Sequence, residues 1–259
     1  MTPTTHDPEL ARRYEEAEQE YLRSLPPEHF MEATDHARQR EITVESFAVV
    51  RTARPDIQCF NELLVQYPRA GETKYGQVVP DNFVVVHPDP IQARGSFNLP
   101  LQPVGPFLML EYVSKYSKRK DYEENYDRYE RELAVPYYFL FYPDSRDLSV
   151  FHLADGKYVS VKPDESGRLA IPELELHVAL VGDWARFWFR GELVPLPEEL
   201  VHQRDAARKQ HAAARKQRDA AQKQRDRERV ARLAAEQRAT VADAEIARLM
   251  AELARAKGG

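Results

Sequence analysis

The sequence predicts an α/β domain, a mixed β-sheet flanked by helices, followed by an extended C-terminal helix. Three observations indicate this class. Across residues 1–197, short runs of β-branched and aromatic residues alternate with segments of helical periodicity, whereas residues 198–259 are rich in Ala, Arg, Gln and Lys. A third observation is that 42% of the 259 residues are hydrophobic, which is enough for a substantial core.

The first two predicted elements are helices. Residues 9–25 read ELARRYEEAEQEYLRSL, and the prolines at 26–27 end this helix. Residues 34–53 read TDHARQREITVESFAVVRTA and predict a second helix that packs on a sheet. Its apolar residues are Ile42, Val44, Phe47, Val49 and Val50.

Runs of β-branched and aromatic residues follow at 56–67, 78–87, 106–113 and 136–142. Three of them are almost continuously apolar, which is typical of central strands covered on both faces. Before the last run, one helical face is formed by Tyr122, Tyr126, Tyr129 and Leu133. The predicted order across residues 78–142 is strand, strand, helix, strand.

Antiparallel strands are expected after residue 142. The pairs Asp155-Gly156 and Ser166-Gly167 are turn signals between apolar segments. We expect these strands to extend one edge or flank of the sheet. Pro195 and Pro197 then form a stiff exit from the domain.

The C-terminal segment repeats at a seven-residue step that begins at Gln203, Gln210 and Gln217. Heptad spacing favours a coiled coil. The small alanines of the repeat favour a solvated single helix equally. The predicted organisation is an N-terminal helical extension at 1–28, a domain at 29–197 and a helical tail at 198–259.

Charge is distributed unevenly along the chain. The formal net charge is -5, but the tail carries about 15 Lys/Arg against about 10 Asp/Glu. An acidic body binds nucleic acid poorly, because phosphate contacts supply most non-specific affinity. A nucleic-acid role therefore needs a local basic patch or the tail.

Several functional classes lack support. Cys59 is the single cysteine, which excludes an internal disulfide and a thiolate zinc site, and we expect it to be a small core residue. No glycine-rich phosphate loop is present, and no histidine forms a convincing site. The charged N-terminus and the lack of a long apolar run predict a cytoplasmic protein without a membrane span.

Two carboxylates within apolar strands are the best chemical candidates. Asp81 lies in VVPDNFVVV and Glu111 in PFLMLEYV. Burying a carboxylate costs several kcal/mol unless it is paired or metal-bound, and on neighbouring strands the two can hold one divalent cation such as Mg²⁺. Pro80 suggests a strand edge or bulge. In the alternative interpretation, Asp81 caps a turn and Glu111 faces solvent.

Three longer stretches carry a family resemblance: VVPDNFVVV, then LEYVSKYSKRKDYEENYDRYERELAVPYYFLFYP, then the closing ELELHVAL and RFWFRGELVPLPEEL. Together they resemble the Uma-two family of restriction-endonuclease-like, PD-(D/E)XK proteins. The resemblance covers residues 29–200 approximately. It implies a restriction-endonuclease-like α/β/α core, a Mg²⁺ or Mn²⁺ cofactor and hydrolysis of DNA phosphodiester bonds.

Carried over by residue, the resemblance makes Asp81 and Glu111 metal ligands. The catalytic lysine of most relatives falls four residues after the Asp that matches Asp121, and this chain has Asn125 there. The candidate substitutes are Lys118 and Lys120, with Lys115 beside them; each can equally contact a phosphate or lie in a solvated loop. Asp121 itself suits a helix N-cap. Glu62 is a further candidate ligand.

Two functions therefore stay open, beside a third interpretation in which the chain is a generic α/β scaffold whose acidic residues are ordinary and bind no metal. The first is a metal-dependent endonuclease acting on DNA with Asp81, Glu111 and a nearby lysine. The second is a catalytically inactive, nuclease-derived module that forms homo-oligomers or recruits a helical partner through residues 198–259.

Overall fold

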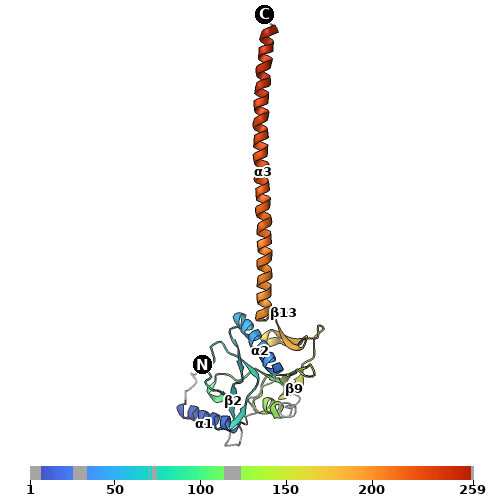
Figure 1. The fold of residues 1–259 in the computed structure, drawn as a ribbon. Coiled ribbons are helices and arrows are strands. Elements are labelled where there is room, and N and C mark those ends of the chain that lie inside the picture. The colour runs from blue at the N-terminus through green and yellow to red at the C-terminus, as the bar shows by residue number, and fades with distance from the viewer. Residues whose placement is uncertain (1–6, 26–33, 70, 72–74, 114–123, 258–259) are drawn as a thin grey trace. The chain divides into compact units, whose positions relative to one another are not determined.

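The computed structural model describes residues 7–25, 34–69, 71, 75–113 and 124–257. The chain divides into two compact units, Met1–Pro197 and Glu198–Gly259. The first unit, called the body below, contains the strands and the helices α1 and α2 (Figure 1). The second unit is helical.

A six-stranded mixed sheet, with the strand order β1-β4-β6-β7-β8-β9, forms the centre of the body. Strands β6 and β7 are parallel, and the other neighbours are antiparallel. The predicted runs at 78–87, 106–113 and 136–142 supply the central strands β4, β6 and β7, as expected. The strands are β1 Ile57–Asn61, β4 Asn82–Val86, β6 Leu108–Tyr112, β7 Tyr137–Tyr142, β8 Asp147–Ala154 and β9 Lys157–Ser160.

Two smaller sheets correct details of the sequence interpretation. The run at 56–67 is two strands rather than one, because Glu62 has a φ of 47° and turns the chain. Only β8 and β9 extend the edge of the main sheet; the later strands form a sheet of their own. The smaller sheets are β3 Tyr75–Val78, β2 Leu64–Pro68 and β5 Ser96–Asn98, and β10 Leu169–Ile171, β11 Leu176–Val181, β12 Trp184–Phe189 and β13 Glu192–Leu193, with 3₁₀ turns at Leu99–Leu101 and Pro172–Leu174.

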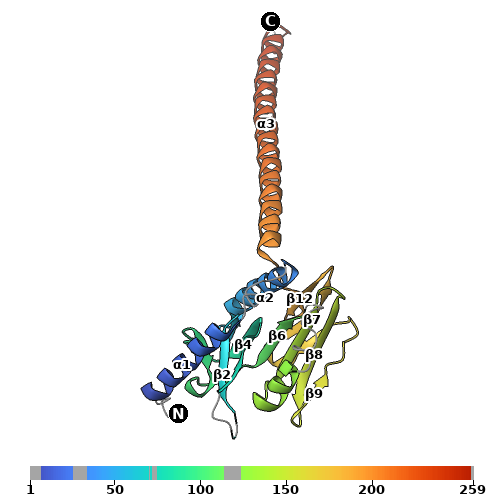
Figure 2. The same cartoon turned by 60° about the horizontal axis from the view of Figure 1, so that its bottom comes forward.

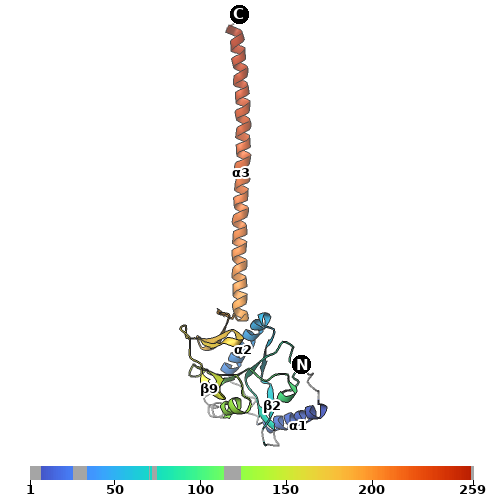
Figure 3. The same cartoon turned by 180° about the vertical axis from the view of Figure 1, so that it is seen from behind.

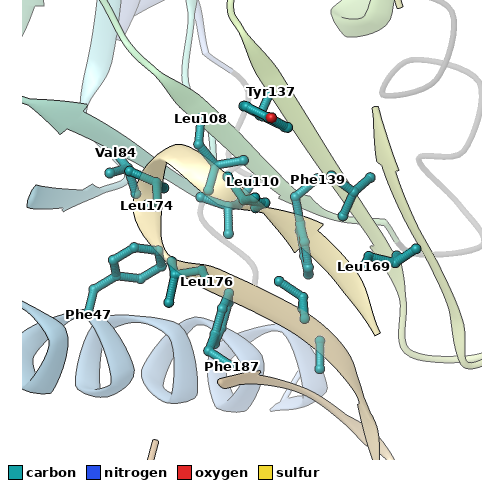
Figure 4. Close-up of a cluster of buried hydrophobic side chains, with 14 of the residues drawn as sticks. Phe47, Val84, Leu108, Leu110, Tyr137, Phe139, Leu169, Leu174, Leu176 and Phe187 are labelled. Carbon is teal, nitrogen blue, oxygen red and sulfur yellow. The ribbon is translucent and has the colours of Figure 1, made fainter. Parts of the chain in front are cut away.

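Helix α2 covers one face of the main sheet and has the predicted bounds, Thr34–Ala53 (Figure 2). Phe47 packs edge-to-face on Phe187 of β12, so α2 and the four-stranded sheet enclose one hydrophobic core with the main sheet (Figure 4). Gln39 is buried, donates to the carbonyl of Ala185 and accepts from its N–H, both at 3.0 Å. These two bonds fix α2 against β12.

A second core lies on the opposite face of the main sheet, under the three-stranded sheet and a helical turn. Helix α1, Pro8–Ser24, has Asp7 as its N-cap, and its buried Tyr14 stacks on Tyr75 with ring centroids 4.2 Å apart. Residues 124–132 are helical, and Arg128–Glu132 form a π-helix. This wide turn, η4, brings its side chains onto the second core.

The predicted turn at Asp155-Gly156 is confirmed. Its φ angles are 51° and 75°, and it joins β8 to β9. Positive φ at both central residues is the requirement of a tight hairpin turn.

Helix α3, Pro197–Lys257, is one uninterrupted helix of 61 residues (Figure 3). At 1.5 Å per residue it is about 90 Å long. Its large apolar side chains are exposed where they are described: Leu200, Val201, Val230, Leu233, Val241, Ile246, Leu249 and Met250. Within the described ranges, no helix has the length and apolar character of a membrane span.

Candidate metal site

Asp81, directly before β4, and Glu111 of the adjacent strand β6 lie at opposing positions. Strands β4 and β6 pair with Asn82 opposite Leu110, so the residue before Asn82 faces the residue after Leu110. Side chains at such paired positions point to the same face of a sheet, with Cβ atoms about 5 Å apart. The backbone N–H of Tyr112 also donates to Asp81 Oδ2 at 2.6 Å. The sequence-predicted pair is therefore brought together.

Pro80 and Asp81 precede β4, which is an interior strand of the main sheet. The expectation of an edge strand is therefore wrong. Pro80 lies before the first residue of the strand, so the strand's ladder of hydrogen bonds does not require an N–H at this position.

Arg40 of α2 reaches the Asp81 side of the pair. Its Nη2 lies 3.2 Å from Asp81 Oδ1, and its Nη1 lies 2.8 Å from Glu62 Oε1. The Arg40 side chain is 13% exposed. One turn further along α2, Thr43 accepts a hydrogen bond from Tyr112 at 2.7 Å, which holds the helix close to this edge of β6.

Glu111 is buried at 4% exposure, so the alternative in which it faces solvent is wrong. Its Oε1 accepts hydrogen bonds from Asn125 Nδ2 at 3.0 Å and from Tyr129 Oη at 2.5 Å. Burial and, after it, the charge of Glu111 raise the pKa of Tyr129 well above its ordinary value, and the charge of Asp81 acts in the same direction. Tyr129 therefore stays protonated and donates.

Asn125 lies at the position where the family resemblance places a lysine. It is 4% exposed, and its Oδ1 is buried without a hydrogen-bond partner. Two polar atoms of one amide thus have different roles: the nitrogen holds Glu111, and the oxygen is left as an acceptor.

The other candidates from the sequence have separate outcomes. Lys115, Lys118, Lys120 and Asp121 lie outside the described residues. Glu62 is linked to Asp81 by Arg40, which forms an ion pair with each of them. Cys59 is partly buried against the first core, and burial raises the pKa of its thiol to about 12, which fits the expected structural role.

Sequence reasoning missed two residues of the site. Tyr129 was predicted only as part of an apolar helical face, and Arg40 was not singled out. The signal for Tyr129 was its distance of four residues from Asn125, which places both on one side of a helical turn. Arg40 carried no signal, because its contact with Asp81 spans 41 residues of sequence.

The donor set fits a hard divalent cation. Carboxylate and amide oxygens are the ligands that Mg²⁺ and Mn²⁺ prefer. In the described part of the chain, no group of three His, Cys, Asp or Glu side chains forms a ready metal cluster. Among the described residues, a cation here would therefore have Asp81 and Glu111 as its carboxylate ligands.

A comparison with family models identifies the family of the chain. The Uma2 family model, described as "Putative restriction endonuclease", matches residues 13–185. The chain belongs to this family, whose members are restriction-endonuclease-like, and its mixed sheet flanked by helices is the fold predicted from the sequence.

One solved structure has a weak similarity to this chain. It is titled a "putative nuclease belonging to DUF820" and comes from Anabaena variabilis. The identity is 18%, the match covers 57% of this chain and 79% of that chain, and the TM-score is 0.43. A comparison with curated proteins gives no match.

Proposed function

We propose that this protein is a divalent-metal-dependent endonuclease that hydrolyses DNA phosphodiester bonds. The observation that carries the proposal is the pair Asp81 and Glu111: extending the register of β4 and β6 by one residue beyond Asn82 and Leu110 sets them opposite each other. Membership of the Uma2 family supports the same reaction class.

Asp81 and Glu111 would hold Mg²⁺ or Mn²⁺. The bound ion supplies a Lewis acid that activates water and stabilises charge on the phosphate. Tyr129 and Asn125 keep the Glu111 carboxylate in place, and Arg40 balances the charge of Asp81. We propose Lys118 or Lys120 as the amine that steadies the transition state.

The test is cleavage of supercoiled and linear DNA with Mg²⁺ or Mn²⁺. We expect Asp81→Asn and Glu111→Gln to lower the cleavage rate at least about 100-fold, because each removes a metal ligand. Glu192→Gln is the matched control, since Glu192 is an exposed strand residue outside the site. Wild-type protein that is folded and cleaves no form of DNA with either metal would contradict the proposal.

The lysines need a separate comparison. Lys118→Ala, Lys120→Ala and the double variant are measured beside Lys115→Ala. We expect the double variant to lose at least about tenfold in cleavage rate while Mn²⁺ binding is kept, because an amine acts on the transition state rather than on the cation. Full activity of the double variant would remove these two residues from the mechanism.

In a second candidate function, the protein is a nuclease-derived module that has lost catalysis and forms oligomers or binds a helical partner through α3. Two observations favour it: Asn125 stands where a lysine is expected, and α3 exposes Ile246, Leu249 and Met250, each by more than half. Such apolar side chains on a helix with heptad repeats are suited to pairing with a second helix.

Light scattering during size exclusion tests this second function. We expect the full chain to be oligomeric, and the double change Leu249→Glu and Met250→Glu to shift it toward monomer. The double change Ala221→Glu and Gln222→Glu adds at least as much negative charge away from the apolar end and is the control. A monomeric wild-type chain at high concentration, with no helical partner bound, would exclude this function.

A further inference from the structure

The amide of Asn125 is oriented by its neighbour. Its Nδ2 donates to Glu111 Oε1 at 3.0 Å, and Tyr129 donates to the same oxygen. The reverse orientation would place the amide oxygen against a carboxylate oxygen, and an ionised carboxylate only accepts hydrogen bonds. The Oδ1 of Asn125 is therefore not the atom that contacts Glu111.

This Oδ1 atom is buried and has no hydrogen-bond partner. The residue is 4% exposed, so bulk water does not reach the atom freely. A buried acceptor without a partner lowers stability, and native proteins keep such groups where a ligand, an ion or a water completes them. The orphaned oxygen thus points to a ligand.

The charges around Asn125 indicate what that ligand is. Glu111 is in direct contact with the amide, and Asp81 faces Glu111 across the β4–β6 pair. A group that satisfies two carboxylates and one carbonyl oxygen together is a hard divalent cation, which takes oxygen ligands of both kinds. A phosphate or another anion would be repelled at this position.

We propose that Asn125 is an oxygen ligand of the metal site, bound to the cation through Oδ1 directly or through one water molecule. In this chain the position thus serves the cation instead of supplying the amine that the family resemblance places there. The inference rests on the proposed function, because it requires that Asp81 and Glu111 bind a metal.

Tyr129 provides the matched control, because it contacts the same Glu111 oxygen from the same helical turn. Tyr129→Phe removes a hydrogen bond that positions Glu111 and leaves the Asn125 oxygen in place. Asn125→Leu removes the positioning hydrogen bond and the proposed ligand together. The difference between the two variants therefore isolates the oxygen of Asn125.

The experiment is calorimetric titration of the full chain with Mn²⁺. Asn125→Leu and Asn125→Ala are expected to weaken Mn²⁺ binding by about tenfold or more, Tyr129→Phe by about threefold at most, and Asn125→Asp to keep or strengthen it. The thermal shift that Mn²⁺ produces is a second readout, and the melting temperature without metal shows that each variant is folded.

Three outcomes would overturn the inference. Wild-type affinity in both Asn125→Leu and Asn125→Ala, with binding abolished in Asp81→Asn, removes Asn125 from the site and leaves the proposed function intact. Equal losses in Tyr129→Phe and Asn125→Leu reduce Asn125 to positioning Glu111. No Mn²⁺ binding by the wild-type chain overturns the inference and the proposed function together.

Discussion

The guanidinium of Arg40 contacts the same Asp81 carboxylate that we propose as a metal ligand. A fixed positive charge close to a cation site opposes the arrival of the cation, and the two compete for one carboxylate. Arg40 also stabilises the metal-free protein, because it balances Asp81 at a site that is only partly exposed. The two effects of this arginine are therefore opposed.

We expect Arg40→Gln to strengthen Mn²⁺ binding about threefold to tenfold and to lower the free energy of unfolding without metal by about 1–3 kcal/mol. Calorimetric titration and urea unfolding measure the two effects. Arg38→Gln is the control, since Arg38 pairs with Glu41 on the same helix. A fall in Mn²⁺ affinity would show that Arg40 supports the cation.

Glu130 is a buried carboxylate outside the candidate site, at the contact between η4 and β9. Its carboxylate accepts the N–H of Tyr158 at 2.7 Å and pairs with Lys157 at 3.0 Å. The N–H of Tyr158 first, and Lys157 with it, lower the pKa of Glu130. A lowered pKa in the folded state stabilises the protein above the ordinary glutamate value and is lost as the pH falls through the lowered value.

Glu130→Gln is therefore expected to lower the free energy of unfolding by about 1–3 kcal/mol at pH 7, with the difference from wild type shrinking below about pH 4. Urea unfolding at pH 7 and at pH 3.5 measures the change, with exposed Glu192→Gln as the control. A difference that is the same at both pH values would show that the charge of Glu130 contributes nothing.

At the scale of elements, β3 is held close to β2 by a glycine. Gly76 is paired with Tyr67, and a Cβ atom at Gly76 would overlap the Tyr67 ring. Tyr67 is buried at 1% exposure, and its hydroxyl donates to Glu132 at 2.6 Å, so the ring cannot move without losing that bond.

We expect Gly76→Ala to lower the free energy of unfolding by about 1–3 kcal/mol through overpacking. Gly105→Ala is the control: its new Cβ would lie 3.3 Å from a methyl group of Leu99, which can adjust, and the change should be within about 0.5 kcal/mol. Thermal unfolding of both variants measures the difference, and equal stabilities would show that the Tyr67 ring relocates freely.

Elements with strong local signals could be predicted from the sequence, and elements defined by distant partners could not. The periodicity of residues 34–53 predicts α2 with its observed bounds, and the apolar runs predict the central strands. The division of the run at 56–67 depends on the positive φ of Glu62, which is not a glycine and gave no signal.

The candidate site follows the same rule. Asp81 and Glu111 could be predicted because a carboxylate within an apolar strand is unusual in any sequence. That they face each other depends on the β4–β6 register, which no local pattern specifies. The contact of Asn125 and Tyr129 with Glu111 required the packing of the helical turn against β6.

At the scale of the whole molecule, charge is separated along the chain. The total of -5 combines a body near -10 with a tail near +5, counted over residues 198–259. Since phosphate contacts with Lys and Arg provide most non-specific DNA affinity, the basic tail is better suited than the acidic body to contact DNA.

We therefore expect a variant ending at residue 197 to bind duplex DNA at least about tenfold more weakly than the full chain, with a shallower dependence on salt. Fluorescence anisotropy at 50 and 200 mM salt measures both quantities, with Ca²⁺ in place of Mg²⁺ to prevent cleavage. Unchanged affinity and salt dependence would place the DNA contacts in the body.

The two halves of the candidate site differ in how far they reach along the chain. In the Glu111 half, Glu111 contacts Asn125 and Tyr129, which follow it by 14 and 18 positions within one strand-helix-strand crossover. In the other half, Arg40 and Asp81 are 41 positions apart. Closing a short loop loses less chain entropy than closing a long one. The Glu111 half is thus suited to form early in folding, as a local unit onto which α2 and β4 later dock.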